Sequence, residues 1–340
     1  MVNNDHGDNL IMNYNYTKKI FHVVLIITAF CFNSLYAEKG AQILELIPSA
    51  KSIALGGAFC AYSEDAASVL YNPAGLSAID HIQVSLAKNY LFDDMDDIFK
   101  KDNYMEYYGA AYSLRDIWIS NIEDRGTIAV FFNKADTAYV GSRSDDSEGG
   151  LYDQVLTVSY AKSVYSIQES GSVSLGLNMK FFEEDISKTE DADGSALDIG
   201  AQFKYPGKTL FAGLSVLNIG GKYERGSSEF RLPLKVLAGL YGRAFKRRLG
   251  ISSDLIMEAG KELNLGLGVS YLLLKPVDIR VGYNPALTSS GFTGGLGLVF
   301  KEIEVLFFYI REISIDFALP VDEECGNFNR IGLNLKLGAY

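Results

Sequence analysis

Long stretches of this chain alternate between apolar and polar residues, from about residue 82 to the C-terminus. The clearest stretch covers residues 263–273, where leucine, valine and tyrosine alternate with asparagine, glycine and serine. Side chains of a β-strand point to opposite faces in turn, so a period of two predicts strands with one apolar face. A helix would mix the two sets of residues on overlapping faces.

About fourteen such segments follow one another, and an antiparallel sheet with short and long connections in turn is the arrangement they favour. The long connections include 136–153, 184–195 and 219–231, and the short ones include 244–248 and 301–303. The penultimate segment, 304–319, has room for a break near Arg311 that would divide it. The predicted strands are 82–91, 104–114, 126–135, 154–163, 171–183, 196–205, 210–218, 232–243, 249–257, 263–273, 277–283, 292–300, 304–319 and 330–340.

Two architectures produce this alternation, a soluble sandwich or barrel and a transmembrane β-barrel. The outer face of a soluble sheet carries many Lys and Glu residues, whereas the second face here is mostly Gly, Ser and Asn with scattered charges. Such a face suits the lumen of a barrel. About 9–11 tilted residues cross the hydrocarbon layer, which fits these segments. The pattern favours an all-β, transmembrane antiparallel barrel over residues 82–340.

The N-terminus has the features of a bacterial export signal. Lys18 and Lys19 precede an apolar run, 20–32, and a small residue, Ala37, follows at a suitable cleavage position. The run is shorter than the ~20 residues that span a bilayer as a helix. Residues 1–37 are therefore predicted to be a signal peptide, which implies export and location in the bacterial outer membrane. A permanent N-terminal anchor is the alternative.

Charge and residue usage argue against several function classes. The formal net charge of −11 disfavours nucleic-acid binding. Without residues 1–37 the chain keeps one histidine, His81, and two cysteines, Cys60 and Cys325, which is too few for the usual zinc sites. A hydrolase needs a base beside its serine, and His81 is the single histidine available. We expect no catalytic residue, no metal and no cofactor.

Residues 38–81 do not alternate and are rich in glycine and alanine. Ser63 precedes two acids and is suited to cap a short helix that runs to Tyr71, where Asn72 and Pro73 would end it. Gly75 permits a tight turn into the first strand. Small residues allow close packing, so this segment is predicted to be a helical plug, or hatch, inside the barrel.

The same segment resembles the N-terminal hatch of the FadL superfamily of outer-membrane barrels, and most closely its PorV/PorQ branch. The resemblance extends over 216–220, 279–284 and 294–298, while Lys51 stands where the family usually has Arg and Tyr71 where it often has Trp. The residues that carry the hatch motif are Leu55, Gly56, Gly57, Asp65, Asn72, Pro73, Ala74 and Gly75.

The resemblance implies a plugged channel, surrounded by outer-membrane lipid, for the uptake or export of hydrophobic small molecules such as a fatty acid. The alternative that it implies is a protein of the type IX secretion system that binds or shuttles secreted cargo. Either role uses the same barrel and hatch. The resemblance also implies that five residues line the lumen and contact the ligand, which are Phe59, Phe131, Leu156, Val158 and Tyr160. The alternative role of these residues is to pack the plug against the wall.

Overall fold

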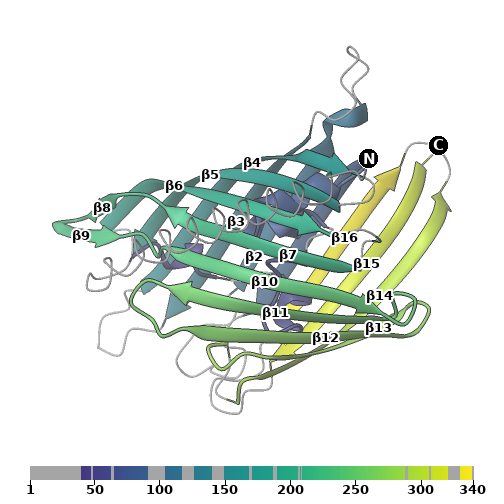
Figure 1. Cartoon of the computed structure of the whole chain (residues 1–340). Helices are drawn as coiled ribbons and strands as arrows, with labels where there is room; N and C mark the ends of the chain where they lie inside the picture. The colour runs from purple at the N-terminus through teal and green to yellow at the C-terminus, as the bar shows by residue number, and fades with distance from the viewer. Residues whose placement is uncertain are drawn as a thin grey trace, which may run out of the picture.

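The computed structural model describes residues 40–46, 49–62, 65–90, 104–116, 126–139, 149–167, 171–186, 190–205, 207, 209–287, 290–305, 308–320 and 330–338. Fourteen antiparallel strands form a closed barrel, in which β1 pairs with both β2 and β16 (Figure 1). The wall strands are β1 (Ile82–Tyr90), β2 (Tyr104–Ser113), β3 (Thr127–Tyr139), β4 (Gly149–Ile167), β5 (Gly171–Ile186), β6 (Glu190–Lys204), β7 (Leu210–Ile219), β10 (Lys235–Ala244), β11 (Leu249–Glu258), β12 (Asn264–Leu274), β13 (Val277–Tyr283), β14 (Phe292–Val305), β15 (Phe308–Pro320) and β16 (Arg330–Gly338).

The expected barrel of fourteen antiparallel strands is confirmed, although several connections differ from the expectation. β14 continues through 301–303, where a turn was expected, and β15 begins at Phe308. No break occurs at Arg311. Instead the pairing of β15 with β16 shifts between Ile310 and Glu312, so the irregularity in the sequence corresponds to a β-bulge.

Three long connections contain more regular structure than the sequence predicted, and one of them is 136–153, into which β3 and β4 extend. The 219–231 segment holds a hairpin of β8 (Lys222–Arg225) and β9 (Ser228–Arg231), whose turn includes Gly226 at φ 58°. β5 and β6 extend well into 184–195. We call the end of the barrel next to β8 and β9 the hairpin mouth. The opposite end, where β1 begins and β16 ends, is the terminal mouth.

The outer face of the wall is apolar. In β4 the side chains of Leu156, Val158 and Tyr160 are 40%, 45% and 43% exposed, whereas those of Thr157 and Ser159 are buried. The prediction that Leu156, Val158 and Tyr160 line the lumen is therefore wrong, because the pleat turns their neighbours inward instead. The same phase recurs in β5, where Leu175, Leu177, Met179 and Phe181 are exposed.

Residues 49–62 and 65–81, which we call the inner segment, lie inside the barrel and contain α2 (Ala50–Ile53), η2 (Ala66–Leu70) and η3 (Pro73–Ala78) (Figure 1). The expected helix before Asn72 is the short 3₁₀ helix η2, and Ser63 lies outside the described residues. Asn72 also begins η3, because its side chain accepts a hydrogen bond from the Ala74 amide. A further 3₁₀ turn, η1 (Gln42–Leu44), precedes the inner segment.

Candidate functional site: the inner segment and its seat

The Gly56–Gly57 pair of the motif adopts a left-handed backbone, with φ values of 65° and 73°. Only glycine takes up this conformation without a steric cost. A Cβ on Gly56 would also lie 2.6 Å from the Leu267 carbonyl oxygen of β12. The Gly56 carbonyl accepts a hydrogen bond of 2.9 Å from the Asn284 side chain. The motif thus lets the inner segment lie directly on the backbone of the wall.

The wall offers glycines of its own beneath this turn. A Cβ on Gly282 would lie 2.0 Å from the Gly56 amide nitrogen, and one on Gly268 would lie 2.6 Å from the Leu55 carbonyl oxygen. A Cβ on Gly266 would lie 2.7 Å from the Gly56 carbonyl oxygen. The glycines on the inner faces of β12 and β13 therefore form a seat that any side chain would disrupt.

A buried carboxylate holds the next part of the inner segment. One oxygen of Asp254, on β11, accepts hydrogen bonds of 2.7 Å from the amides of both Phe59 and Cys60. Asp254 is almost completely buried, and Cys60 is a buried free thiol. Buried amides that lose their acceptor cost about 1–3 kcal/mol each. Asp254 therefore fixes this part of the inner segment to β11.

Asn72 joins two parts of the inner segment to the wall. Its side-chain NH₂ donates to the carbonyls of Cys60 and Ala201, each at 3.0 Å. The adjacent Pro73 packs so closely on Gly176 that a Cβ there would lie 2.3 Å from the Pro73 carbonyl carbon. These contacts account for Asn72, Pro73 and Ala74 as residues that position the inner segment against β5 and β6.

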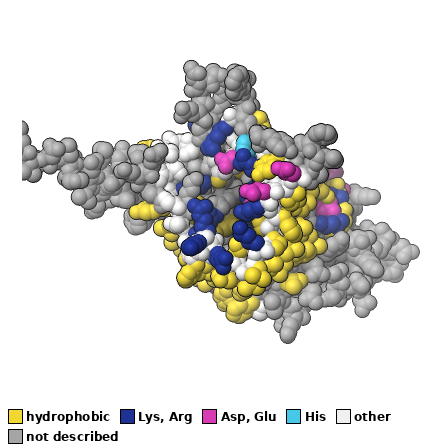
Figure 2. All heavy atoms as spheres, turned by 90° about the vertical axis from the view of Figure 1, so that its right-hand side faces the viewer, with side chains coloured by type: hydrophobic (Ala, Val, Ile, Leu, Met, Phe, Trp, Pro, Cys, Tyr) yellow, Lys and Arg dark blue, Asp and Glu magenta, His cyan; other side chains and the backbone are white. Residues whose placement is uncertain are grey.

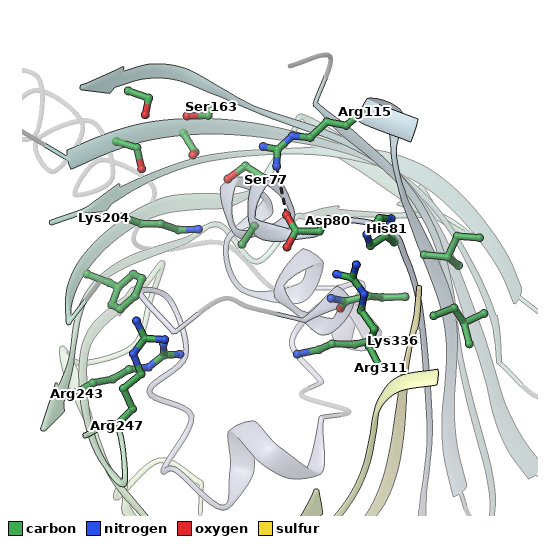
Figure 3. A pocket seen from close by; sticks show the side chains of 18 residues that line it. Ser77, Asp80, His81, Arg115, Ser163, Lys204, Arg243, Arg247, Arg311 and Lys336 are labelled. Carbon is green, nitrogen blue, oxygen red and sulfur yellow. Dashed lines mark hydrogen bonds and ion pairs between the residues drawn. The ribbon is translucent and has the colours of Figure 1, made fainter. Parts of the chain in front are cut away.

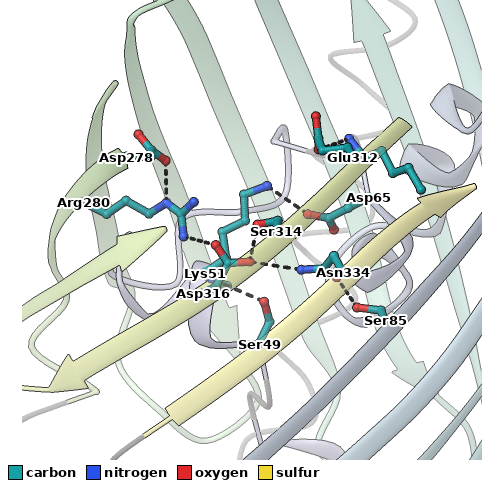
Figure 4. Close-up of polar contacts among 12 residues, drawn as sticks. Ser49, Lys51, Asp65, Ser85, Asp278, Arg280, Glu312, Ser314, Asp316 and Asn334 are labelled. Carbon is teal, nitrogen blue, oxygen red and sulfur yellow. Dashed lines mark hydrogen bonds and ion pairs between the residues drawn. The ribbon is translucent and has the colours of Figure 1, made fainter. Parts of the chain in front are cut away.

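Asp65, the acid of the hatch motif, pairs with Lys51, which stands at the position where the resemblance predicts Arg. The Lys51 amine lies 3.0 Å from a carboxylate oxygen of Asp65, and both side chains are largely buried (Figure 4). Burial lowers the pKa of the Lys51 amine, but Tyr62 and Asp65 beside it raise that pKa more, so it lies well above its ordinary value. Lys51 therefore stays protonated and keeps its ion pair with Asp65.

A second ionic cluster lies on the wall strands β13, β15 and β16. Arg280, on β13, lies 2.5 Å from Asp316 and 2.8 Å from Asp278 (Figure 4). Asp316 also accepts hydrogen bonds from Ser314 at 2.9 Å and from Asn334 at 3.0 Å. A buried ion must be paired and hydrogen-bonded to avoid a large desolvation penalty, and this cluster satisfies both conditions.

Asp198 is the centre of a third polar cluster, on β5 to β7. It lies 2.8 Å from the Lys180 amine and accepts a hydrogen bond of 2.7 Å from Asn178. Asn178 in turn donates to the Val69 carbonyl at 2.8 Å, which ties η2 to the wall. The sequence did not single out these wall residues, although a polar residue on the less apolar face of a strand was the signal that could have found them.

Phe59 and Phe131 lie inside the barrel, as expected, and both are fully buried. The ring of Phe59 lies 5.0 Å from that of Tyr71 and 4.9 Å from that of Tyr62. Phe131 stacks on Tyr107 with ring centroids 6.1 Å apart. Neither ring lines either of the two cavities described below, and both pack the inner segment and the wall together.

Two cavities lie on opposite sides of the inner segment. The one at the hairpin mouth measures about 500 Å³ and is lined by β5, β6 and the hairpin, with Phe182, Tyr223 and Leu232 as its apolar members. The other, at the terminal mouth, measures about 530 Å³. Volumes of this size accommodate a small molecule. The inner segment lies between the two ends of the barrel (Figure 1).

Tyr223 of the hairpin holds the start of the described chain at the hairpin mouth. Its hydroxyl accepts a hydrogen bond of 2.5 Å from the Ala41 amide and donates one of 2.6 Å to Glu184. Around it lies an apolar cluster that includes Ile43, Phe182 and Phe230. The hairpin mouth thus combines a buried apolar cluster with a cavity that Phe182, Tyr223 and Leu232 of this cluster help to line.

The described residues contain no group of three or more metal-ligating side chains. In that same part of the chain, no helix has the length and apolarity needed to cross a membrane.

Known structures resemble this chain in fold. The toluene transporter TbuX of Ralstonia pickettii superimposes with a TM-score of 0.53 at 12% identity, over 84% of this chain and 96% of its own. The toluene transporter TodX of P. putida gives a TM-score of 0.50 at 12% identity, over 84% and 95% of the two chains. No protein-family description and no curated protein matches the sequence. The chain therefore has the barrel fold of these two transporters.

Proposed function

We propose that the protein is an outer-membrane barrel of the FadL type and a plugged channel for hydrophobic small molecules. The observation that carries this proposal is the apolar outer face of a closed barrel, with exposed Leu, Ile, Val, Phe and Tyr side chains on most wall strands. Soluble proteins rarely expose contiguous apolar patches larger than a few hundred Å². A lipid-facing apolar band around a polar interior is the arrangement of transmembrane barrels.

The inner segment acts as the plug in this proposal. It separates the two cavities, so a solute can cross only when the segment or part of it moves. The apolar cluster around Tyr223 favours entry of a hydrophobic ligand at the hairpin mouth. The fold shared with two toluene transporters supports a ligand of this class.

The ends of the barrel have assigned sides in this proposal. Outer-membrane barrels hold both termini of the barrel at the periplasmic side, so the terminal mouth faces the periplasm and the hairpin mouth faces the outside. Residues 1–37, proposed as the signal peptide, and residues 38–39, 47–48 and 63–64 of the proposed 38–81 hatch lie outside the described residues. The resemblance to the PorV/PorQ branch stays part of the proposal.

Insertion of a charge in the outer band tests the membrane location. We expect Val158→Arg to reduce the amount of folded barrel, because an arginine at the bilayer midplane costs about 2–4 kcal/mol. The measurement is heat-dependent gel mobility of purified outer membranes. Val158→Leu is the matched control and should retain the folded band. Equal amounts of folded barrel in the two variants would contradict a lipid-facing position for Val158.

Uptake of a hydrophobic solute tests the channel function. Cells that carry the gene should take up a radiolabelled fatty acid or toluene faster than cells from which it has been deleted, and reintroduction of the gene should restore the rate. An unchanged rate for both solutes, together with stable co-purification of secretion components, would favour the type IX secretion role. None of the contacts among the described residues favours the secretion role over transport.

A further inference from the structure

The terminal mouth carries a concentration of positive charge that the proposed channel for hydrophobic solutes does not require. Seen from this end, Lys and Arg side chains gather around a hollow in the middle of the face, while hydrophobic side chains lie outside them (Figure 2). The hollow is the cavity of about 530 Å³. Its cationic lining residues are Arg115, Lys204, Arg243, Arg247, Arg311 and Lys336.

These cations come from different parts of the wall and converge on one space. Lys204 lies at the end of β6 and Lys336 near the end of β16, and the two side chains point toward one another across the cavity (Figure 3). Arg243 and Arg247 flank the end of β10 on one side of the cavity. Arg311 enters from the opposite side, at the bulge where β15 loses its register with β16.

Negative charge at the cavity is much smaller. Asp80 is the one acidic residue among the described lining residues, and it lies 3.3 Å from Arg115. Glu312, beside the cavity, lies 2.7 Å from Lys336. Among the described residues, two carboxylates therefore lie at a cavity lined by six cations. Like charges held this close repel one another, and a cleft lined by one sign of charge concentrates ions of the opposite sign.

The cavity at the opposite end has a different lining, with Asp193, Lys222 and Glu224 as its charged residues. Glu183, Asp185, Asp191 and Asp193 lie where β5 and β6 meet the hairpin mouth. The cationic cavity is therefore not a general property of the barrel ends. It is confined to the side that the proposed orientation turns toward the periplasm.

We propose that the cavity at the terminal mouth binds a small molecule with two or more phosphate or carboxylate groups. Arginine binds such groups through two parallel hydrogen bonds, and the serine hydroxyls in the lining offer further donors. Ser77 and His81, from the end of the inner segment, also line the cavity. A bound anion therefore contacts the inner segment as well as the wall. The serines that line the wall are Ser163, Ser166, Ser172 and Ser174.

Binding of the trisulfonated dye pyranine, measured by fluorescence anisotropy on the purified full-length barrel in neutral detergent, tests this site. Saturable binding that inorganic pyrophosphate displaces is the expected result. Arg247→Gln combined with Arg311→Gln should weaken binding by about tenfold for each guanidinium removed, since a charged hydrogen bond contributes roughly 1.5–3 kcal/mol.

The matched control removes the same charge close to the site. Lys246 and Arg248 lie in the same turn as Arg247, are exposed, and do not line the cavity. Lys246→Gln combined with Arg248→Gln should therefore bind pyranine as the unmodified protein does. All variants must show the heat-dependent mobility of a folded barrel. Equal weakening in both double variants, or no saturable binding to the unmodified protein, would overturn the proposal.

A change in the surrounding lipid distinguishes two sources of the anion, a lipid headgroup and a soluble molecule. In nanodiscs, replacing part of the phosphatidylcholine with phosphatidylglycerol should compete with pyranine if lipid headgroups reach the cavity. If pyranine binding is unchanged by phosphatidylglycerol but is displaced by pyrophosphate, the site takes a soluble anion. Because this assay measures binding and not transport, its result tests the anion site separately from the proposed channel function.

Discussion

Gly282→Val is expected to unseat the inner segment and open the barrel. An added Cβ would lie 2.0 Å from the Gly56 amide nitrogen and 2.5 Å from the Leu55 carbonyl carbon. Atoms at such distances cannot coexist, and both obstacles are backbone atoms that cannot rotate away. The wall strand is paired on both sides, to β12 and β14, so the inner segment is the part that must move.

Two readouts follow the displacement. Cells with Gly282→Val should become sensitive to vancomycin, which an intact outer membrane excludes. Cys60, a buried free thiol, should also become reactive toward a maleimide when Cys325→Ser makes it the single cysteine after residue 37. An open lumen and an accessible Cys60 should appear together.

Gly294→Val is the matched control for this experiment. Gly294 is also in a wall strand, but a Cβ there meets no atom within 4 Å. The control should exclude vancomycin and keep Cys60 protected. If Gly282→Val behaved as Gly294→Val does, the inner segment would not rest on Gly282 as the structure has it.

The period-two alternation made the barrel predictable, because a strand with one apolar face must bury that face or place it against lipid. It did not identify the face correctly in β4, where Leu156, Val158 and Tyr160 were assigned to the lumen. The membrane-barrel prediction itself implies that the more apolar set faces outward. Val158 and its exposed neighbours follow that rule, and the small or polar Thr157 and Ser159 face inward.

The motif was recognisable in the sequence, but the residues that hold it were not. Gly56 and Asn72 stand in a compact segment with an unusual composition. The wall residues that hold this segment include Asn284, just after β13, which bonds Gly56, and Asp254 of β11, which bonds Phe59 and Cys60; both lie far along the chain and are brought to the segment only by barrel closure. The β8–β9 hairpin was missed for a different reason, since Lys222–Arg231 contains too short an alternation to separate it from a loop.

The central claim is that the inner segment must move for a hydrophobic solute to pass, and a reversible lock tests it. The Cys60 sulfur lies 3.8 Å from the Ser215 hydroxyl oxygen of β7, so Ser215→Cys places a second thiol within reach of a disulfide. Cys325→Ser removes the competing cysteine. Oxidation should then tie the inner segment to the wall, and a reductant should release it.

The control carries Cys325→Ser alone, so it keeps Ser215 and forms no lock. Both proteins are reconstituted in liposomes, oxidised, and assayed for entry of a radiolabelled fatty acid and of toluene before and after reduction. We predict that the oxidised lock variant loses most of its transport, that reduction restores it, and that the control is unaffected by either treatment. Equal transport by the locked and the reduced protein would contradict a plug that moves.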